Sequence, residues 1–216
     1  MKRISKKEII LDAALTLFNR EGTSAMTTNH IARAAEVSPG NLYYHFRNKE
    51  EIIRELYERF CGEYASIWTT FLHGPFATKT VTDAVVAGFN MNAKYRFIAL
   101  ELGSLCHRDS VLMSRQREYG AVHFSLIRSA VDRMVAANVL ATTSDGTLYD
   151  DVLHMLWLIN QYWLPYMYLL ADFPDDADVR RGVRLALRVI EPYFTDAYRQ
   201  QVMKVDTTLF QEGHYL

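Results

Sequence analysis

Apolar residues near the start of the chain recur at the spacing of an amphipathic helix. Four of them fall on one side of that helix: Ile10, Ala14, Leu17 and Phe18. Ser5 and Glu8 have the Ser-x-x-Glu spacing of a capping box, which satisfies unpaired N–H groups at a helix start. Gly22 can adopt the left-handed conformation that commonly ends helices. The pattern therefore predicts a first helix from Ser5 to Gly22.

The segment 27–51 predicts two short helices joined by a tight turn, followed by the start of another helix. Thr27, or Thr28 beside it, can cap the first, whereas Ser38 can cap the second with Pro39 at its first position. Apolar side chains at helical spacing point inward: Ile31, Ala32, Ala35, Val37, Leu42 and Phe46. The outward-facing positions are Gly40, Asn41, Tyr43, Tyr44, His45 and Arg47. A short capped helix with exposed aromatic and hydrogen-bonding groups fits the DNA major groove, as in a helix-turn-helix.

The rest of the chain carries long helical patterns and no period-two strand pattern or internal repeat. We expect further helices over residues 49–73, 81–92, 93–107, 110–138 and 147–171, and a last one to about residue 203. The predicted fold is all-α with about nine helices. Residues 1–50 are expected to form a three-helix helix-turn-helix head, and residues 51–216 a larger helical body.

The stretch 152–171 contains 20 residues without a formal charge, which is long enough to span a bilayer. Polar His154, Asn160 and Gln161 lie inside it, and basic anchors are missing at both ends. A helix that is apolar all round also occurs in the cores of soluble proteins, and we favour that interpretation. Because no signal peptide precedes the first helix, we expect a cytoplasmic protein without a membrane partner.

The charge distribution separates the start of the chain from the rest. Residues 1–47 contain seven Lys or Arg against four Asp or Glu, a net charge of +3, whereas the whole chain has −1. This asymmetry favours a DNA-facing N-terminus and a neutral to acidic body. The two cysteines, Cys61 and Cys106, have no metal-binding spacing, so we expect neither a metal nor another cofactor.

The N-terminal segment also resembles the TetR-type transcriptional regulators. The matching residues are AALTLF at 13–18, Gly22, Thr27, IA at 31–32, VSPGNLYYHF at 37–46 and KEE at 49–51. The resemblance implies that five residues contact DNA phosphates: Thr27, Thr28, Tyr43, His45 and Lys49. It places four others nearest to base edges, where sequence is read: Pro39, Gly40, Asn41 and Tyr44.

The resemblance further implies a homodimer that pairs through its last two long helices on a near-palindromic operator in double-stranded DNA. The middle helices would enclose a pocket for a small-molecule effector. Its candidate lining residues are Phe89, Met91, Tyr95, Phe97, Leu102, Trp157, Asn160, Gln161, Trp163 and Tyr166. Aromatic walls with a few amides suit a mainly apolar ligand with one or two polar groups.

The leading interpretation is a ligand-responsive repressor, and two alternatives remain open. One is a regulator or activator that binds DNA without any ligand, since no residue determines the sign of regulation. The other is an all-α enzyme with Cys106 as the nucleophile. No zinc-protease motif, phosphate-binding glycine-rich loop or Gly-x-Ser-x-Gly motif occurs, and the sequence places no activating base near that thiol. We therefore expect no enzyme activity and no catalytic residue.

Overall fold

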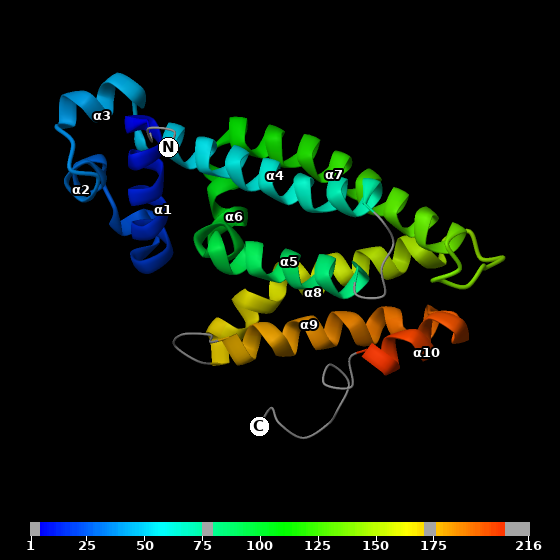
Figure 1. Cartoon of the computed structure of the whole chain (residues 1–216). Helices are drawn as coiled ribbons and strands as arrows, with labels where there is room; N and C mark the ends of the chain where they lie inside the picture. The colour runs from blue at the N-terminus through cyan, green and yellow to red at the C-terminus, as the bar shows by residue number, and fades with distance from the viewer. Residues whose placement is uncertain (1–4, 75–79, 171–175, 206–216) are drawn as a thin grey trace. The chain divides into compact units, whose positions relative to one another are not determined.

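The structure, a computed structural model of the chain, describes residues 5–74, 80–170 and 176–205 (Figure 1). These residues form ten α-helices, one more than the approximate number predicted, and one short 3-10 helix. The α-helices are α1 (Lys6–Ala25), α2 (Thr28–Ala34), α3 (Pro39–His45), α4 (Lys49–His73), α5 (Thr80–Lys94), α6 (Arg96–Arg108), α7 (Ser110–Ala136), α8 (Leu148–Leu170), α9 (Asp176–Ile190) and α10 (Asp196–Val205). The predicted all-α fold is confirmed.

Contacts divide the chain into two compact units. The first consists of the described residues in 1–62 and 95–117, and the second of those in 63–94 and 118–216. Helices α4 and α7 each contribute their N-terminal part to the first unit and their C-terminal part to the second. The predicted boundary at residue 50 separates two functional domains rather than two compact units, and it stays a prediction.

Helices α1, α2 and α3 begin where their sequence predicts. The Ser5 hydroxyl accepts a hydrogen bond from the Glu8 N–H at 3.2 Å, and Ser38 accepts one from the Asn41 N–H at the same distance. Thr27, rather than Thr28, caps α2 by accepting from the His30 N–H at 3.3 Å. The inward side chains Ile10, Ala14, Phe18, Ile31, Leu42 and Phe46 are all buried. Short-range capping and apolar spacing therefore determine the three-helix head.

Gly22 interrupts α1 with a φ of +77°, the left-handed conformation in which glycine avoids a steric cost. The chain then remains helical to Ala25. Thr23, which follows Gly22, is held by Glu101 of α6. The Glu101 carboxylate accepts a hydrogen bond from the Thr23 N–H at 3.0 Å and another from the Thr23 hydroxyl. Phe97 packs on Phe18 with ring centroids 5.3 Å apart. Helix α6 thereby fixes the C-terminal end of α1 within the first unit.

Asp109 joins α4 to the start of α7 in the same unit. Its carboxylate accepts two hydrogen bonds from the Arg54 guanidinium, at 2.7 and 3.0 Å. It also caps α7 by accepting from the N–H groups of Val111 and Leu112 at 3.0 and 3.2 Å. The hydrogen bond from Arg54 lowers the pKa of Asp109 below its ordinary value. Asp109 therefore combines an ion pair with a helix cap, and burial raises the pKa of the nearby Cys106 thiol.

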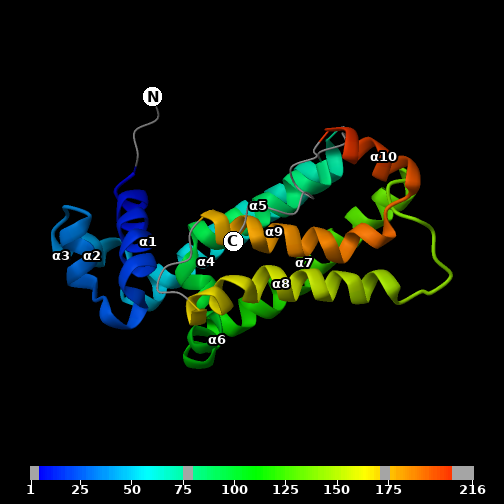
Figure 2. The ribbon, with the colours of Figure 1, turned by 90° about the horizontal axis from the view of Figure 1, so that it is seen from below.

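The second unit places α5, α8 and α9 side by side (Figures 1 and 2). One apolar core joins residues from most of its helices: Phe71, Val81, Ala84, Ala130, Val131, Met134, Val139, Leu140, Tyr149, Leu153, Ile190, Phe194 and Tyr198. A smaller core joins α5 to α9 through Phe89, Val183, Ala186 and Leu187.

The prediction of one continuous last helix is wrong. Helix α9 ends at Ile190, the 3-10 helix η1 covers Glu191–Tyr193, and α10 starts at Asp196. Pro192 explains the break, because proline lacks an N–H and its ring clashes with the preceding helical turn. Phe194 then takes an extended conformation, buries its ring and forms a β-bridge with Leu140.

Helix α8 has an exposed apolar face, although its sequence predicted burial on all sides. Seven large apolar side chains on it are at least one-third exposed: Met155, Trp157, Leu158, Tyr162, Tyr166, Leu169 and Leu170. Among the described residues, no helix combines the length and apolarity that crossing a membrane requires. The helix continues to Leu170 through Pro165, and its predicted last residue, 171, lies outside the described residues.

Gly182 is a position where packing excludes any side chain. A Cβ atom there would lie 2.4 Å from Phe89 Cε1 and 2.5 Å from Trp163 Cδ1. We expect Gly182→Ala to lower the free energy of unfolding by about 2 kcal/mol, because overpacking outweighs the gain in helix propensity. Urea denaturation followed by circular dichroism measures this change.

The matched control is Gly103→Ala on α6, where an added Cβ meets nothing within 4 Å. This variant should gain up to about 1 kcal/mol, because alanine favours the helix over glycine. Equal stability changes in the two variants would contradict the packing argument.

Candidate nucleic-acid interface and ligand cavity

Helix α3 buries one face and presents the other to solvent. Leu42 is fully buried, whereas Tyr43 is 50% exposed and Tyr44 is 83% exposed. Pro39 and Gly40 are also exposed. Because the capped N-terminus and the buried leucine fix the helix, the two tyrosines are held outward on a rigid element.

The remaining predicted base-reading residue, Asn41, is half-buried, and its Oδ1 has no hydrogen-bond partner among the described residues. A side-chain amide can pair with the edge of an adenine base. His45 is half-buried as well and makes an edge contact with the Tyr44 ring, at 5.0 Å between centroids. Helix α3 therefore brings all the predicted base-reading positions onto one short surface.

The predicted phosphate-contacting residues lie on α2, on α3 and at the start of α4. Thr28 Oγ1 and the Tyr43 hydroxyl lie 3.0 Å apart, so α2 and α3 present these two groups together. Thr27 uses an oxygen lone pair for its cap and retains its own hydroxyl proton as a donor. These positions can supply the hydroxyl donors that DNA phosphates require.

Lys49 has a structural role that the sequence did not indicate. Its Nζ donates to the carbonyl oxygens of Thr23 and Met26, at 2.6 and 2.8 Å. The ammonium group thereby satisfies unpaired carbonyls at the end of α1. An ammonium has three N–H groups, so one remains for the phosphate contact, which stays a prediction.

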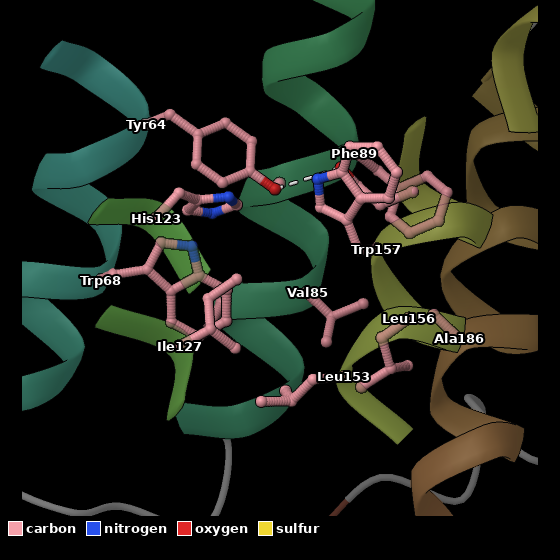
Figure 3. Close-up of a pocket in the computed structure, with 13 residues that line it drawn as sticks. Tyr64, Trp68, Val85, Phe89, His123, Ile127, Leu153, Leu156, Trp157 and Ala186 are labelled. Carbon is pink, nitrogen blue, oxygen red and sulfur yellow. Dashed lines mark hydrogen bonds between the residues drawn. The ribbon is translucent and has the colours of Figure 1, made fainter. Parts of the chain in front are cut away.

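A cavity with an empty volume of about 470 Å³, including the space at its mouth, lies within the second unit. Its lining residues come from α4, α5, α7, α8 and α9: Tyr64, Trp68, Ala84, Val85, Gly88, Phe89, His123, Ile127, Leu153, Leu156, Trp157, Asn160 and Ala186. Figure 3 shows Tyr64, Trp68 and His123 facing Phe89, Leu153 and Trp157 across this space. Its apolar walls with a few polar groups are typical of small-molecule sites.

Three predicted ligand residues, Phe89, Trp157 and Asn160, line this cavity. Met91, Leu102, Gln161, Trp163 and Tyr166 are not among its lining residues. Trp163 instead packs against Gly182, and Tyr166 is 51% exposed on the outer face of α8.

Tyr95 and Phe97, like Leu102, belong to the first unit. Tyr95 is fully buried there, and its hydroxyl accepts a hydrogen bond from Arg59 Nε at 3.0 Å. Phe97 is buried against Phe18. These two aromatic side chains are therefore part of the core of the first unit.

The cavity-lining residues of α4 and α7 are not among the predicted ligand residues. Tyr64 and Trp68 lie four residues apart on α4, and His123 and Ile127 lie four residues apart on α7. Residues at this spacing share a helix face, which was the available signal. The spacing alone does not show that the two faces meet, because α4 and α7 lie far apart along the chain.

A hydrogen-bonded amide network closes one end of the cavity. The Tyr64 hydroxyl donates to Asn160 Oδ1 at 3.1 Å (Figure 3). Asn92 Nδ2 donates to the same atom at 2.9 Å and to the Asn160 carbonyl oxygen at 2.7 Å. These bonds fix the Asn160 side chain and supply the hydrogen-bond partners that a polar amide in an apolar helix needs.

The cavity walls are electrically neutral. None of the described lining residues is Asp, Glu, Lys or Arg. Burial raises the pKa of Tyr64 well above its ordinary value and lowers the pKa of His123 to about 4. Both groups are therefore uncharged at neutral pH, and the cavity offers no charge to pair with a charged ligand.

Two family models match the chain. The model for bacterial regulatory proteins of the tetR family matches residues 10–56, and a model described as a bacterial transcriptional repressor matches residues 72–202. The second match alone covers more than half of the chain. Together the two matches include α3 and every cavity-lining residue except Tyr64 and Trp68, which lie between the two matched ranges.

Individual proteins show the same likeness. The negative regulator of the biofilm operon from Staphylococcus epidermidis, IcaR, is 40% identical over 58 residues, which are 27% of this chain and 31% of that protein. The chain thus spans about a third or less of the length of the curated relatives it matches first.

Solved structures extend the likeness over the whole fold. A TetR-family regulator from Marinobacter aquaeolei VT8 superposes with a TM-score of 0.84 at 26% identity, covering 95% of this chain and 99% of the other. SmeT of Stenotrophomonas maltophilia, in complex with triclosan, gives a TM-score of 0.58 at 21% identity, covering 89% and 93%.

The exposed face of α3, the two family models and the superposed fold all indicate a DNA-binding regulator of transcription rather than an enzyme. The chain belongs to the TetR family of bacterial transcriptional regulators.

Proposed function

We propose that the chain is a homodimeric repressor that a mainly apolar small molecule releases from a near-palindromic operator. The observation that carries this proposal is the exposure of Tyr44, at 83%, on a short helix whose opposite side is buried. Holding an aromatic ring in water has no benefit for folding, whereas such a ring is available for a base edge in the major groove.

The proposed DNA contacts are of two kinds: phosphate contacts that position the protein and base contacts that read the sequence. Five residues hold phosphates: Thr27, Thr28, Tyr43, His45 and Lys49. Four residues read base edges: Pro39, Gly40, Asn41 and Tyr44. Only the second group carries sequence information, because the phosphate backbone is the same at every base pair. The exposure of α3 and the paired hydroxyls of Thr28 and Tyr43 support this division.

The exposed apolar face of α8 supports the homodimer. Met155, Leu158, Tyr162 and Leu169 follow one another at steps of three, four and seven residues. That spacing is the seam along which two helices pack together. Pairing through α8 and α9 would place two copies of α3 in successive major grooves, roughly 34–36 Å apart.

The neutral cavity supports the response to a ligand. Triclosan bound to SmeT is an instance of a small molecule in a protein of this fold. IcaR, a negative regulator, supports repression as the mode of control. Release requires that the ligand bind more tightly to a dimer whose two heads no longer match the operator spacing.

A capture experiment tests the proposal. The purified chain is refolded from guanidinium to remove any bound molecule, mixed with sheared genomic DNA of the source organism, and the retained fragments are sequenced. We expect a few enriched fragments that share a near-palindrome. The control is a variant carrying both Tyr43→Ala and Tyr44→Ala, which leaves buried positions untouched. Enrichment of the same fragments by this control, or no enrichment at all, would overturn the proposed DNA recognition.

A further inference from the structure

Two residues that line the cavity each carry a nitrogen atom without a hydrogen-bond partner among the described residues. The atoms are His123 Nε2 and Trp68 Nε1, and both are buried. The His123 side chain is 5% exposed. Buried polar groups are nearly always hydrogen-bonded in native proteins, and leaving one unpaired costs about 1–3 kcal/mol. Two such atoms on neighbouring rings of one cavity indicate that a ligand completes their bonding.

Aromatic rings pack around His123 and hold it in place, but they do not supply a hydrogen bond to its Nε2 atom. Tyr119 stacks on the imidazole with centroids 5.4 Å apart, and Tyr64 meets it edge-on at 4.7 Å. The Tyr64 hydroxyl is directed to Asn160. The Trp68 ring lies 6.3 Å from the imidazole, centroid to centroid, and Figure 3 shows the two side by side. Both rings thus belong to residues that line the same cavity.

The two nitrogens require different bonding from a ligand. The indole N–H of Trp68 can only donate, so the ligand must supply an acceptor. The imidazole of His123 is neutral, because burial lowers its pKa to about 4, and one nitrogen of a neutral imidazole accepts. A hydroxyl group offers both functions on one oxygen atom, since it accepts one hydrogen bond and donates another.

We infer that the effector is an uncharged, mainly apolar alcohol or phenol whose hydroxyl group bonds Trp68 Nε1 and His123 Nε2. This inference rests on the proposed function, because it assigns the chemistry of the proposed effector cavity. A carboxylate is disfavoured there, since no described cation lines the wall and an unpaired buried charge is costly. Phe89, Leu153 and Leu156 supply the apolar surface for the body of the molecule (Figure 3).

Four probes of one shape test the inference: 2-naphthol, 2-methoxynaphthalene, naphthalene and 2-naphthoate. Their dissociation constants for the full chain are measured by titration calorimetry at pH 7. We expect 2-naphthol to bind about tenfold more tightly than naphthalene, because it gains two hydrogen bonds. 2-Methoxynaphthalene can accept a hydrogen bond but cannot donate one, so its affinity should lie between those of 2-naphthol and naphthalene. 2-Naphthoate should bind most weakly.

Two variants connect this ranking to the named nitrogens. Trp68→Phe and His123→Phe keep an aromatic ring and remove the polar atom, so each should reduce the preference for 2-naphthol over naphthalene about three- to fivefold. His73→Phe, an exposed position on α4, is the matched control and should leave the preference unchanged. Melting curves confirm that each variant is folded before the titration.

Tightest binding by 2-naphthoate would overturn an uncharged effector. Equal affinities of 2-naphthol and naphthalene, or a preference unaffected by both variants, would overturn the hydroxyl site, as would failure of all four probes to bind. The predicted ranking combined with unchanged operator affinity at saturating 2-naphthol would support the inference. That same result would count against ligand-controlled release, so the two failures are distinguishable.

Discussion

Replacing Tyr44 with alanine is expected to weaken operator binding about 100-fold while leaving the protein folded. A contact to a base edge contributes about 1–3 kcal/mol, and each homodimer carries two copies of α3. A loss of about 1.4 kcal/mol in each head lowers the affinity tenfold per head, and therefore about 100-fold for the dimer. The ring is 83% exposed, so its removal should leave the melting temperature unchanged. Fluorescence anisotropy with the captured operator measures the affinity.

Sequence preference and salt dependence separate reading from positioning. Tyr44→Ala should lower affinity for the operator much more than for random DNA, with an unchanged slope of log affinity against log salt. Tyr44→Phe keeps the ring and removes the hydroxyl, so it shows which of the two contacts the base. Equal losses on operator and random DNA would assign Tyr44 to phosphate binding instead.

The head of the molecule was predictable because its determinants are local. Thr27 and Ser38 cap helices through N–H groups three residues ahead, and Leu42 and Phe46 lie on one face four residues apart. Interactions of this range are visible in the sequence itself. Gly22 has the positive φ that favours glycine, but it interrupts the first helix, which continues to Ala25 instead of ending there as predicted.

The cavity was only partly predictable because its walls come from helices distant in sequence. Phe89 and Trp157 line it as expected, but Tyr95 and Phe97 are core residues of the other unit. An aromatic residue on a helix face does not reveal which helix will cover it. His123 was missed because only the fold brings α7 next to α4.

Lys49 and Pro192 show two further limits. The Lys49 ammonium binds carbonyl oxygens from the end of α1, more than twenty residues earlier, and no spacing rule indicates that contact. Pro192 is a helix breaker inside the predicted last helix, and the structure ends α9 just before it. The Lys49 contact leaves no local pattern in the sequence, whereas the proline is a local signal for the break.

Introducing a charge on α8 is expected to separate the homodimer. Leu158 is 50% exposed within one chain, so Leu158→Glu should leave each subunit folded. In the proposed dimer the same position is covered by the partner helix, and the two subunits bring two carboxylates into one apolar seam. An uncompensated buried charge costs about 3–5 kcal/mol, so the dimer dissociation constant should rise at least 100-fold. Sedimentation velocity should then show the 25.0 kDa chain instead of twice that mass.

Val122→Glu on α7 is the matched control, because it places the same charge at a 58% exposed apolar position outside α8 and α9. It should remain dimeric with unchanged operator affinity. Leu158→Glu should lose most operator affinity although its α3 is intact, since a single head gains no binding energy from the second half-site. Dissociation by Val122→Glu but not by Leu158→Glu would move the interface to α7. A Leu158→Glu monomer with full operator affinity would instead show that one head suffices, and it would remove the need for a palindrome.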